Sequence, residues 1–262
     1  MTLHPTRAEL DLDGRRLSYL DYGGLGQPVL ALHGHLHEGS TWEHLAHELA
    51  PDWRIFAPDQ RGHGDSDRAP DYSRDGYLAD AAALLHRLDP GPVVVLGHSL
   101  GGLNAFQFAA RHPHLVRAMI IEEHGAGTMD GPNPLAFLHG CLYQSNSRAE
   151  LLEGLGPAGP YFTHALRQLP DGSWRLPFHP DDMITSVEQE RGDHWGDWLA
   201  TDCPALLIRG IRGSIIPAAE AHAMIARRPN THLIELDTDH MVHTGDPIGY
   251  AKAVREFLHS LS

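Results

Sequence analysis

Ser99 has the sequence surroundings of a reactive serine. The segment 93–96, three valines and a leucine, predicts a buried strand, and 103–111 predicts a helix. Gly97 and Gly101 flank the serine in the pattern G-x-S-x-G. A strand that turns at once into a helix holds the serine in a tight turn with its hydroxyl exposed at the sheet edge. Ser99 is therefore the candidate nucleophile.

A second motif lies upstream, after a predicted strand at 54–57. Residues 59–66 read Asp-Gln-Arg-Gly-His-Gly-Asp-Ser. Together with the strand, G-x-S-x-G and helix around Ser99, this D-x-R-G-x-G-x-S loop resembles the α/β-hydrolase superfamily over nearly the whole chain. The resemblance implies a mostly parallel, doubly wound α/β sheet with an inserted helical cap, and a structural role for the 59–66 loop.

A serine hydroxyl needs a general base, because it is a poor nucleophile at neutral pH. The chain has 21 histidines, so most of them are structural. The resemblance selects His240, which follows a predicted strand at 232–236 and precedes a predicted terminal helix at 247–261. His243, three residues on, is the competitor.

The third member of a triad is a carboxylate, and here the sequence departs from the common family pattern. The usual acid position falls on Gly213, which has no side chain, and Asp239 is poorly placed to reach the ring of its neighbour His240. A minority of the family carries a glutamate 24 residues after the nucleophile, which is Glu123 here. Strand alternation sends Glu122 and Glu123 to opposite faces, so only one can meet the histidine. We expect Glu123, with Glu122 as the alternative.

Two backbone N–H groups must stabilise the oxyanion that forms during acyl transfer. One is expected at Leu100, at the start of the helix, where the helix dipole favours negative charge. By resemblance to the family's His-Gly-x loop, the other is the N–H of His35. An alternative interpretation of His33, His35, His37 and Glu38 is a zinc site, which is disfavoured because no partner segment with an acid and a histidine stands out. We therefore expect no metal and no cofactor.

The elements that must position these residues alternate along the chain. A hairpin is predicted at 9–22, further strands at 29–32, 116–123 and 205–210, and further helices at 41–50, 77–88 and 218–227. Between 125 and 199 the pattern changes to short helical pieces, glycine and proline breaks, and a small hairpin around Asp171-Gly172. The expected division is a core of 1–124 and 200–262 with a cap of 125–199. Residues expected to line a pocket beneath the cap are His33, Leu36, His98, Phe137, Trp174 and Trp195.

Composition limits the class of partner. The chain has 262 residues with 34 acidic and 20 basic side chains, a formal net charge of −14. That charge argues against nucleic acid and anionic membranes. Two cysteines, no apolar stretch of membrane-spanning length and no apolar leader at Met1–Arg7 favour a cytoplasmic protein.

The expected function is a cofactor-independent serine hydrolase that cleaves a small carboxylic ester or lactone. Serine at the elbow argues against dehalogenase and epoxide hydrolase chemistry, because those relatives use aspartate there. Carbon–carbon bond hydrolysis and perhydrolysis remain open, as does a non-catalytic ligand-binding role.

Overall fold

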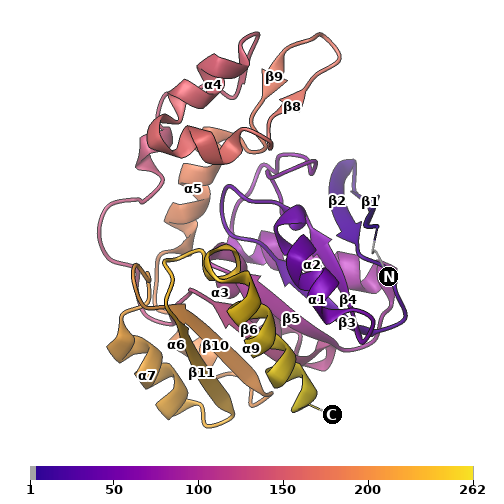
Figure 1. The fold of residues 1–262 in the computed structure, drawn as a ribbon, viewed down its shortest axis with the longest axis vertical. Coiled ribbons are helices and arrows are strands. Elements are labelled where there is room, and N and C mark those ends of the chain that lie inside the picture. The colour runs from indigo at the N-terminus through magenta and orange to yellow at the C-terminus, as the bar shows by residue number, and fades with distance from the viewer. Residues whose placement is uncertain (1–3, 262) are drawn as a thin grey trace.

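The computed structural model describes residues 4–261 and has an eight-stranded sheet at its centre (Figure 1). The strands lie in the order β1-β2-β4-β3-β5-β6-β10-β11. β2 is antiparallel to both of its neighbours, and every other pair is parallel. Their bounds are β1 Thr6–Leu12, β2 Arg15–Asp21, β3 Gln27–Leu32, β4 Trp53–Pro58, β5 Val93–His98, β6 Val116–Glu122, β10 Ala205–Gly210 and β11 Thr231–Leu236. The doubly wound α/β sheet expected from the sequence is confirmed. Residues 1–3 of the segment interpreted as lacking a leader lie outside the described residues.

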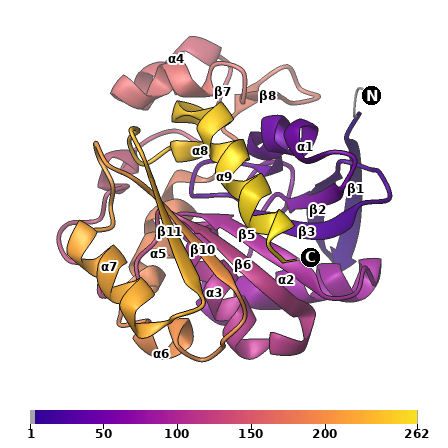
Figure 2. The ribbon, with the colours of Figure 1, turned by 60° about the horizontal axis from the view of Figure 1, so that its bottom comes forward.

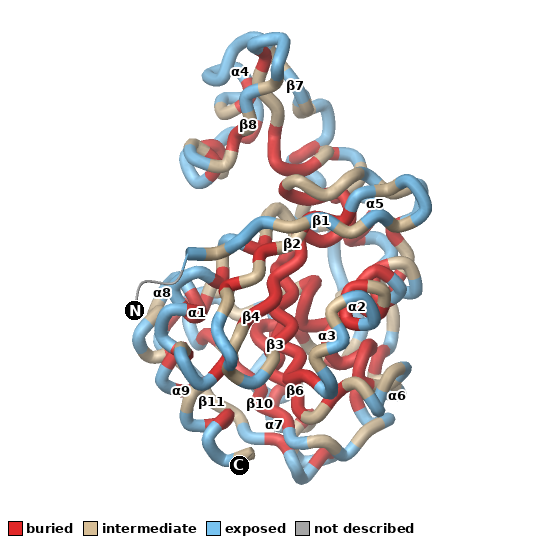
Figure 3. Tube along the Cα trace, turned by 90° about the vertical axis from the view of Figure 1, so that its right-hand side faces the viewer, coloured by how far each residue is buried: buried red, intermediate tan, exposed pale blue. Residues whose placement is uncertain are grey.

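Helices cover both faces of this sheet, so its central strands are buried on both sides (Figure 3). Apolar side chains of α2, α3, α6 and α7 pack on one face, and those of α1, α8 and α9 pack on the other (Figures 1 and 2). These helices are α1 Glu43–Leu49, α2 Arg74–Leu88, α3 Leu100–Arg111, α6 Trp195–Trp198, α7 Ala218–Arg227, α8 Val242–Gly245 and α9 Pro247–His259. Burial on both faces explains why β3, β5 and β10 are runs of apolar residues without polar alternation.

The 59–66 loop braces the base of the site. The buried carboxylate of Asp59 accepts hydrogen bonds from the N–H groups of Gly39 (2.8 Å) and Asp65 (3.0 Å). Gly64 has a φ of +56°, and a Cβ there would lie 2.5 Å from the Asp59 carboxylate. The loop therefore ties the end of β4 to the segment that follows β3, in line with the structural role that the resemblance implied.

The cap rises above one end of the sheet between β6 and β10 (Figure 1). It contains α4 (Arg148–Gly154), α5 (Pro180–Glu190) and a small sheet of β7 (Gln144–Ser145), β9 (Trp174–Arg175) and β8 (Arg167–Gln168). The β8–β9 pair is the hairpin expected around Asp171-Gly172. The two ends of the insertion meet where the His194 N–H donates to the Ala126 carbonyl (2.9 Å).

The chain re-enters the core earlier than the expected boundary at residue 199. Trp198 of α6 is fully buried in the core cluster beneath α3. Its ring packs edge-on against Phe106 of α3, with the centroids 5.8 Å apart. Among the described residues, no helix is long and apolar enough to cross a membrane.

Candidate active site

Ser99 occupies the turn between β5 and α3, with φ +51° and ψ −118°. A positive φ is costly for a residue with a side chain and marks a backbone held in place by its surroundings. A Cβ on Gly97 would lie 1.9 Å from the Gly101 carbonyl oxygen, and a Cβ on Gly101 would lie 2.0 Å from that of Leu32. Both positions of the motif therefore require glycine, and the half-exposed Ser99 stands at the strand–helix junction as expected.

The carboxylate of Glu123 is fully buried and lies beside His240. The Nδ1–H of His240 donates to Oε2 of Glu123 over 3.1 Å. Glu123 follows the last residue of β6, and its φ of +54° turns the chain there.

Three further donors hold the same carboxylate. They are the N–H of Gly210 (2.7 Å), the hydroxyl of Ser214 (2.7 Å) and the N–H of Ile215 (3.0 Å). Gly210 is the last residue of β10, and Ser214 and Ile215 belong to the loop after it, in which the usual family acid would stand. This loop supplies no carboxylate at Gly213, and instead fixes the one supplied by β6.

His240 is placed next to the elbow by His98, the residue before Ser99. The Nε2–H of His98 donates to the His240 carbonyl (3.0 Å), and the two ring centroids are 4.7 Å apart. The Ser99 N–H donates to the carbonyl of Glu122, so the elbow is also tied to the strand end that carries Glu123. Glu123 and His240 are thus in contact, and Ser99 is tied through its N–H to the residue before Glu123 and through its neighbour His98 to the His240 backbone.

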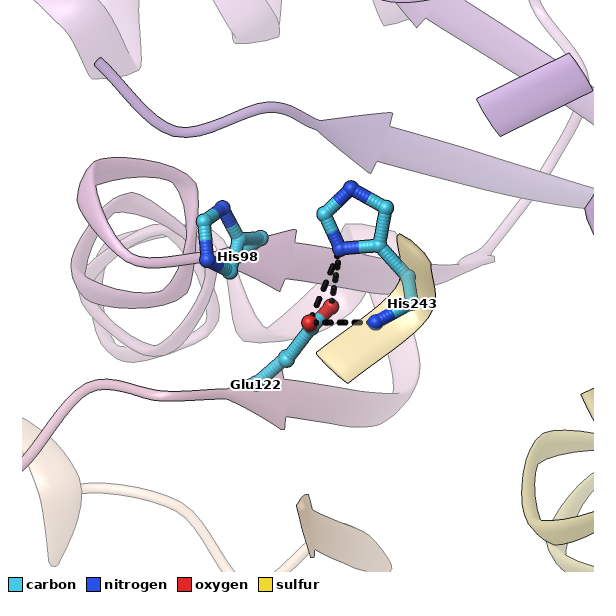
Figure 4. Close-up of side chains that lie close together, drawn as sticks. All are labelled: His98, Glu122 and His243. Carbon is cyan, nitrogen blue, oxygen red and sulfur yellow. Dashed lines mark hydrogen bonds and ion pairs between the residues drawn. The ribbon is translucent and has the colours of Figure 1, made fainter. Parts of the chain in front are cut away.

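Glu122 and His243 form a second carboxylate–histidine pair (Figure 4). Glu122 accepts hydrogen bonds from the N–H of His243 (2.9 Å) and from its Nδ1–H (2.8 Å). Both side chains are buried, and Nε2 of His243 accepts from the Thr41 hydroxyl (2.9 Å). Glu122 and His243 were the alternatives to Glu123 and His240 in the sequence analysis. They contact each other and anchor the turn α8, which follows His240.

The loop after β3 lies directly against the elbow. A Cβ on Gly34 would lie 2.5 Å from Nδ1 of His98 and 3.2 Å from Cβ of Ser99. This close approach places the next residue, His35, near the elbow. Leu100, the first residue of α3, offers its N–H from the elbow itself. The two expected oxyanion donors are thus on segments in contact with each other.

The comparisons with known proteins agree with this fold. A family model described as alpha/beta hydrolase fold matches residues 27–247. The chain belongs to this family. Lipase LipV of Mycobacterium tuberculosis is 31% identical over 264 residues, covering 90% of this chain and 95% of LipV.

Two further matches have a more specialised name. A 2-(acetamidomethylene)succinate hydrolase of Mesorhizobium japonicum is 25% identical over 259 residues, covering 90% of this α/β-hydrolase and 89% of the relative. A crystal structure of E-2-(acetamidomethylene)succinate hydrolase superposes with a TM-score of 0.84 at 24% identity, covering 98% of this chain and 100% of that structure, and supports the fold.

The zinc interpretation of His33, His35, His37 and Glu38 is not supported by the contacts in this α/β-hydrolase. His33 donates from Nδ1 to the Gly34 carbonyl (2.8 Å) and accepts at Nε2 from the Gln60 N–H (2.9 Å). Glu38 is paired with Arg167 (2.7 Å).

Among the described residues, one group of histidine and carboxylate side chains is compact enough to share an ion: His98, Glu122 and His243 (Figure 4). Both ring nitrogens of His243 already have partners, so this group is explained as a hydrogen-bonded anchor.

The residues expected to line a pocket lie in several parts of the structure. His33 and His98 are buried. Trp174 packs in the cap with the exposed Arg148 over its ring (5.3 Å). Trp195 packs on the core with the exposed Arg227 over its ring (4.0 Å). The part of these four residues in a pocket stays a prediction.

Leu36 and Phe137 belong to the side of the site that faces the cap. Leu36 packs against the apolar cluster that joins the cap to Leu100. Phe137 is 47% exposed on the cap, and its role at the pocket stays a prediction.

A polar cluster under the cap was missed by the sequence analysis. Arg74 of α2 donates to Oδ1 of Asn104 on α3 (3.0 Å), and its guanidinium lies over the Tyr77 ring (4.7 Å). Glu190, at the end of α5, is 5% exposed, with Oε1 3.8 Å from Nη1 of Arg74. Burial raises the pKa of Glu190 to about 7, although Arg74 and His240 act to lower it. Nothing in the sequence indicated that Arg74 and Glu190 would be buried together, because they are far apart in the chain and each resembles a charged residue on the exposed face of a helix.

Several histidines around the site are uncharged at neutral pH. Burial lowers the pKa of His33, His37, His63 and His124 to about 3. Burial, and then neighbouring histidines, hold the pKa of His98 well below its usual range. An uncharged His98 can donate its single N–H to the His240 carbonyl and add no positive charge beside the base.

Proposed function

We propose that this α/β-hydrolase is a cofactor-independent serine hydrolase that cleaves a small carboxylic ester or lactone through an acyl-enzyme. The observation that carries the proposal is the buried Glu123 carboxylate on Nδ1 of His240, beside the strained Ser99 elbow. That hydrogen bond leaves Nε2 of His240 unprotonated, as a general base requires. The esterase and lipase names of relatives support the same chemistry.

In the proposed reaction, Oγ of Ser99 attacks the ester carbonyl carbon while Nε2 of His240 takes the hydroxyl proton. Glu123 keeps the ring oriented and stabilises its charged form. The N–H groups of Leu100 and His35 stabilise the oxyanion. Collapse of the tetrahedral intermediate breaks the bond to the leaving alcohol, which receives the proton from His240. Water then attacks the acyl-enzyme by the same steps and releases the acid.

The direct test is labelling with a fluorophosphonate, followed by peptide mapping, together with turnover of a panel of esters and lactones of graded size. We expect wild-type protein to be labelled on Ser99 and Ser99→Ala to be unlabelled. Ser99→Ala should lower kcat by about 10⁴- to 10⁶-fold, as loss of a triad nucleophile does. Near-normal turnover by a folded Ser99→Ala protein would overturn the proposal. Lack of both labelling and turnover in the wild type would favour the ligand-binding alternative.

A further inference from the structure

The loop after β3 is held from above by the cap as well as from below by the elbow. The imidazole of His35 contacts two cap residues, one helical turn apart on α5. Its Nε2 is hydrogen-bonded to Oγ of Ser186 (2.9 Å), and its Nδ1 lies 3.6 Å from Oε1 of Glu190. Ser186 is also hydrogen-bonded to the Tyr77 hydroxyl (2.9 Å), so its own position is fixed by the core.

The cap holds this loop at two more points. Nη2 of Arg167, in the cap strand β8, donates to Oε2 of Glu38 (2.7 Å), and Nε of the same residue donates to Asp65 (3.0 Å). Leu36, between the two polar contacts, packs on the apolar cluster of the cap. Side chains from α5, β8 and the cap interior therefore contact three residues of the segment 35–38, namely His35, Leu36 and Glu38.

The backbone of this segment needs such support. Leu36 has a φ of +67°, in the left-handed region that disfavours residues with a Cβ. Conformations of this kind persist where the surrounding structure over-determines them. The core holds this segment by close backbone packing at Gly34 and by hydrogen bonds from the Gly39 N–H to Asp59 (2.8 Å) and from the Thr41 N–H to the Glu38 carbonyl (3.1 Å). The cap adds the polar contacts of the His35 side chain and the Arg167 contact of the Glu38 carboxylate.

The buried Glu190 carboxyl fits the same arrangement. Its Oε1 is inaccessible and makes no hydrogen bond within the described part of the chain, and its nearest cations or rings are Arg74 (3.8 Å) and His35 (3.6 Å). Both separations are longer than an ordinary charge-assisted hydrogen bond, so the Glu190 carboxyl contributes little to stability as an ion pair. The carboxyl does lie beside the second ring nitrogen of His35, so that residues of α5 lie next to both nitrogens of the imidazole.

We propose that the cap assembles the oxyanion hole: Arg167, Ser186 and Glu190 are positioning residues that hold the 35–38 loop so that the His35 N–H faces the reacting carbonyl. The inference rests on the proposed function, because it assigns a role within that reaction. Oxyanion donors act only when they lie about 2.7–3.1 Å from the developing charge, and a misplacement of about 1 Å can cost roughly 100-fold in rate. A cap that is not seated would therefore leave the Ser99 elbow and the His240–Glu123 hydrogen bond intact and the enzyme slow.

The main test compares Arg167→Met with two control variants that also remove cap–core contacts. Arg175 pairs with Asp65 (3.3 Å) but does not touch the loop, so Arg175→Met controls for the Asp65 contact. Arg68 pairs with Asp182 of α5 (2.6 Å), so Arg68→Met controls for general weakening of cap docking. We expect Arg167→Met to lower kcat about 10-fold or more with KM changed less than threefold. Both controls should stay within twofold of wild type.

A second measurement separates oxyanion stabilisation from simple packing. An alkylboronic acid accepts the Ser99 oxygen at boron, and one oxygen of the resulting tetrahedral adduct occupies the oxyanion hole. Its inhibition constant should rise in Arg167→Met and Ser186→Ala by about the same factor as kcat falls. A merely structural role would not make these two factors track each other.

The His35 side chain is tested by rescue and by coupling. His35→Ala keeps the backbone N–H but removes both cap contacts, and should lower kcat about 10- to 100-fold. His35→Gln, which can still reach Ser186, should recover part of that loss. Ser186→Ala should cost little more in the His35→Ala background than His35→Ala alone, because both variants remove the same contact.

The outcomes distinguish the inference from the function on which it rests. A wild-type protein without labelling or turnover overturns the proposed function. An active wild type in which Arg167→Met and Ser186→Ala match the two controls overturns the cap inference alone. The cap inference alone is also overturned if Arg167→Met, Arg175→Met and Arg68→Met all lose activity equally. A general weakening of cap docking would then be the cause.

Discussion

The Nδ1 atom of His240 lies 3.1 Å from Oε2 of Glu123, a carboxylate that the end of β10 and the loop after it hold with three further donors. The loop that lacks an acid at Gly213 thus retains a part in the site by fixing the acid of a neighbouring strand. One residue earlier, Glu122 makes the corresponding contact with His243. The geometry therefore separates an active-site pair, half exposed at His240, from a structural pair that is fully buried.

Replacing each glutamate by glutamine distinguishes these two pairs. Glu123→Gln should lower kcat by about 10²- to 10⁴-fold, because the histidine loses the charge that orients its ring and stabilises its protonated form. Glu122→Gln should mainly lower stability, by about 3 kcal/mol, because it breaks a buried carboxylate–histidine pair. Steady-state kinetics and urea unfolding of both variants check this. A folded Glu122→Gln protein with the larger loss of kcat would reverse the assignment of the two carboxylates.

The space around Gly213 predicts that the carboxylate partner of His240 can be moved from residue 123 to residue 213. A Cβ built there would lie 3.5 Å from the nearest atom, Cβ of Asp239, which is ordinary contact, and its backbone does not have a positive φ. Gly213→Asp should therefore fold, and in the wild-type background it should change kcat by less than threefold. In a Glu123→Ala background we expect it to raise kcat at least 10-fold by offering the histidine a carboxylate again.

Gly213→Asn is the matched control for that rescue, since it adds the same volume without the charge. Equal kcat values for the two substitutions in the Glu123→Ala background would show that a carboxylate at residue 213 does not reach His240.

Local sequence was sufficient to predict the Ser99 turn and the contact between Glu123 and His240. The G-x-S-x-G turn, the apolar strands and the two successive glutamates at a strand end are features of short segments, and parallel strands bring their carboxyl ends to one edge. Strand alternation also predicted that Glu122 and Glu123 would have different partners. It did not predict that each would find a histidine, because that depends on the turn α8.

The cap could not be predicted in the same way. Its short helices and two-residue strands have little periodicity, so side-chain direction follows from packing. Trp174 and Trp195 show this, since each has an apolar ring that an arginine covers at the surface. The side chain of His35 shows it too: the sequence suggested a role for its backbone, whereas its contacts with α5 depend on where the cap is seated.

The buried histidines predict a protein that loses stability in acid. Their folded pKa lies at about 3 or well below the usual 6.5, so between those values the unfolded chain binds more protons than the folded one. Stability should therefore be fully present above pH 6.5 and fall as the pH decreases towards 3, by up to about 1.4 kcal/mol per pH unit for each histidine. Urea unfolding between pH 4 and 7 measures the slope. His63→Asn, which removes one such group, should reduce that slope, and an unchanged slope would contradict the prediction.

Glu190 predicts a pH dependence of the opposite sign. Burial raises its pKa from 4.5 to about 7, so between these values the folded state binds the extra proton. Its contribution to stability is therefore fully present below pH 4.5, is lost as the pH rises to 7, and changes no further above that, with an upper limit of about 3 kcal/mol. Glu190→Gln should remove this loss, so that the variant gains stability relative to wild type on going from pH 5 to pH 8.

The comparison with wild type cancels the contribution of the histidines, which both proteins share. Glu188→Gln serves as the control on the same helix, because that side chain is half exposed and paired with Arg191 at the surface. Its stability relative to wild type should be nearly constant over the same range. If Glu190→Gln behaves like Glu188→Gln, the Glu190 carboxyl is ionised without penalty, and a cation nearer than the 3.8 Å separation from Arg74 must then be compensating its charge.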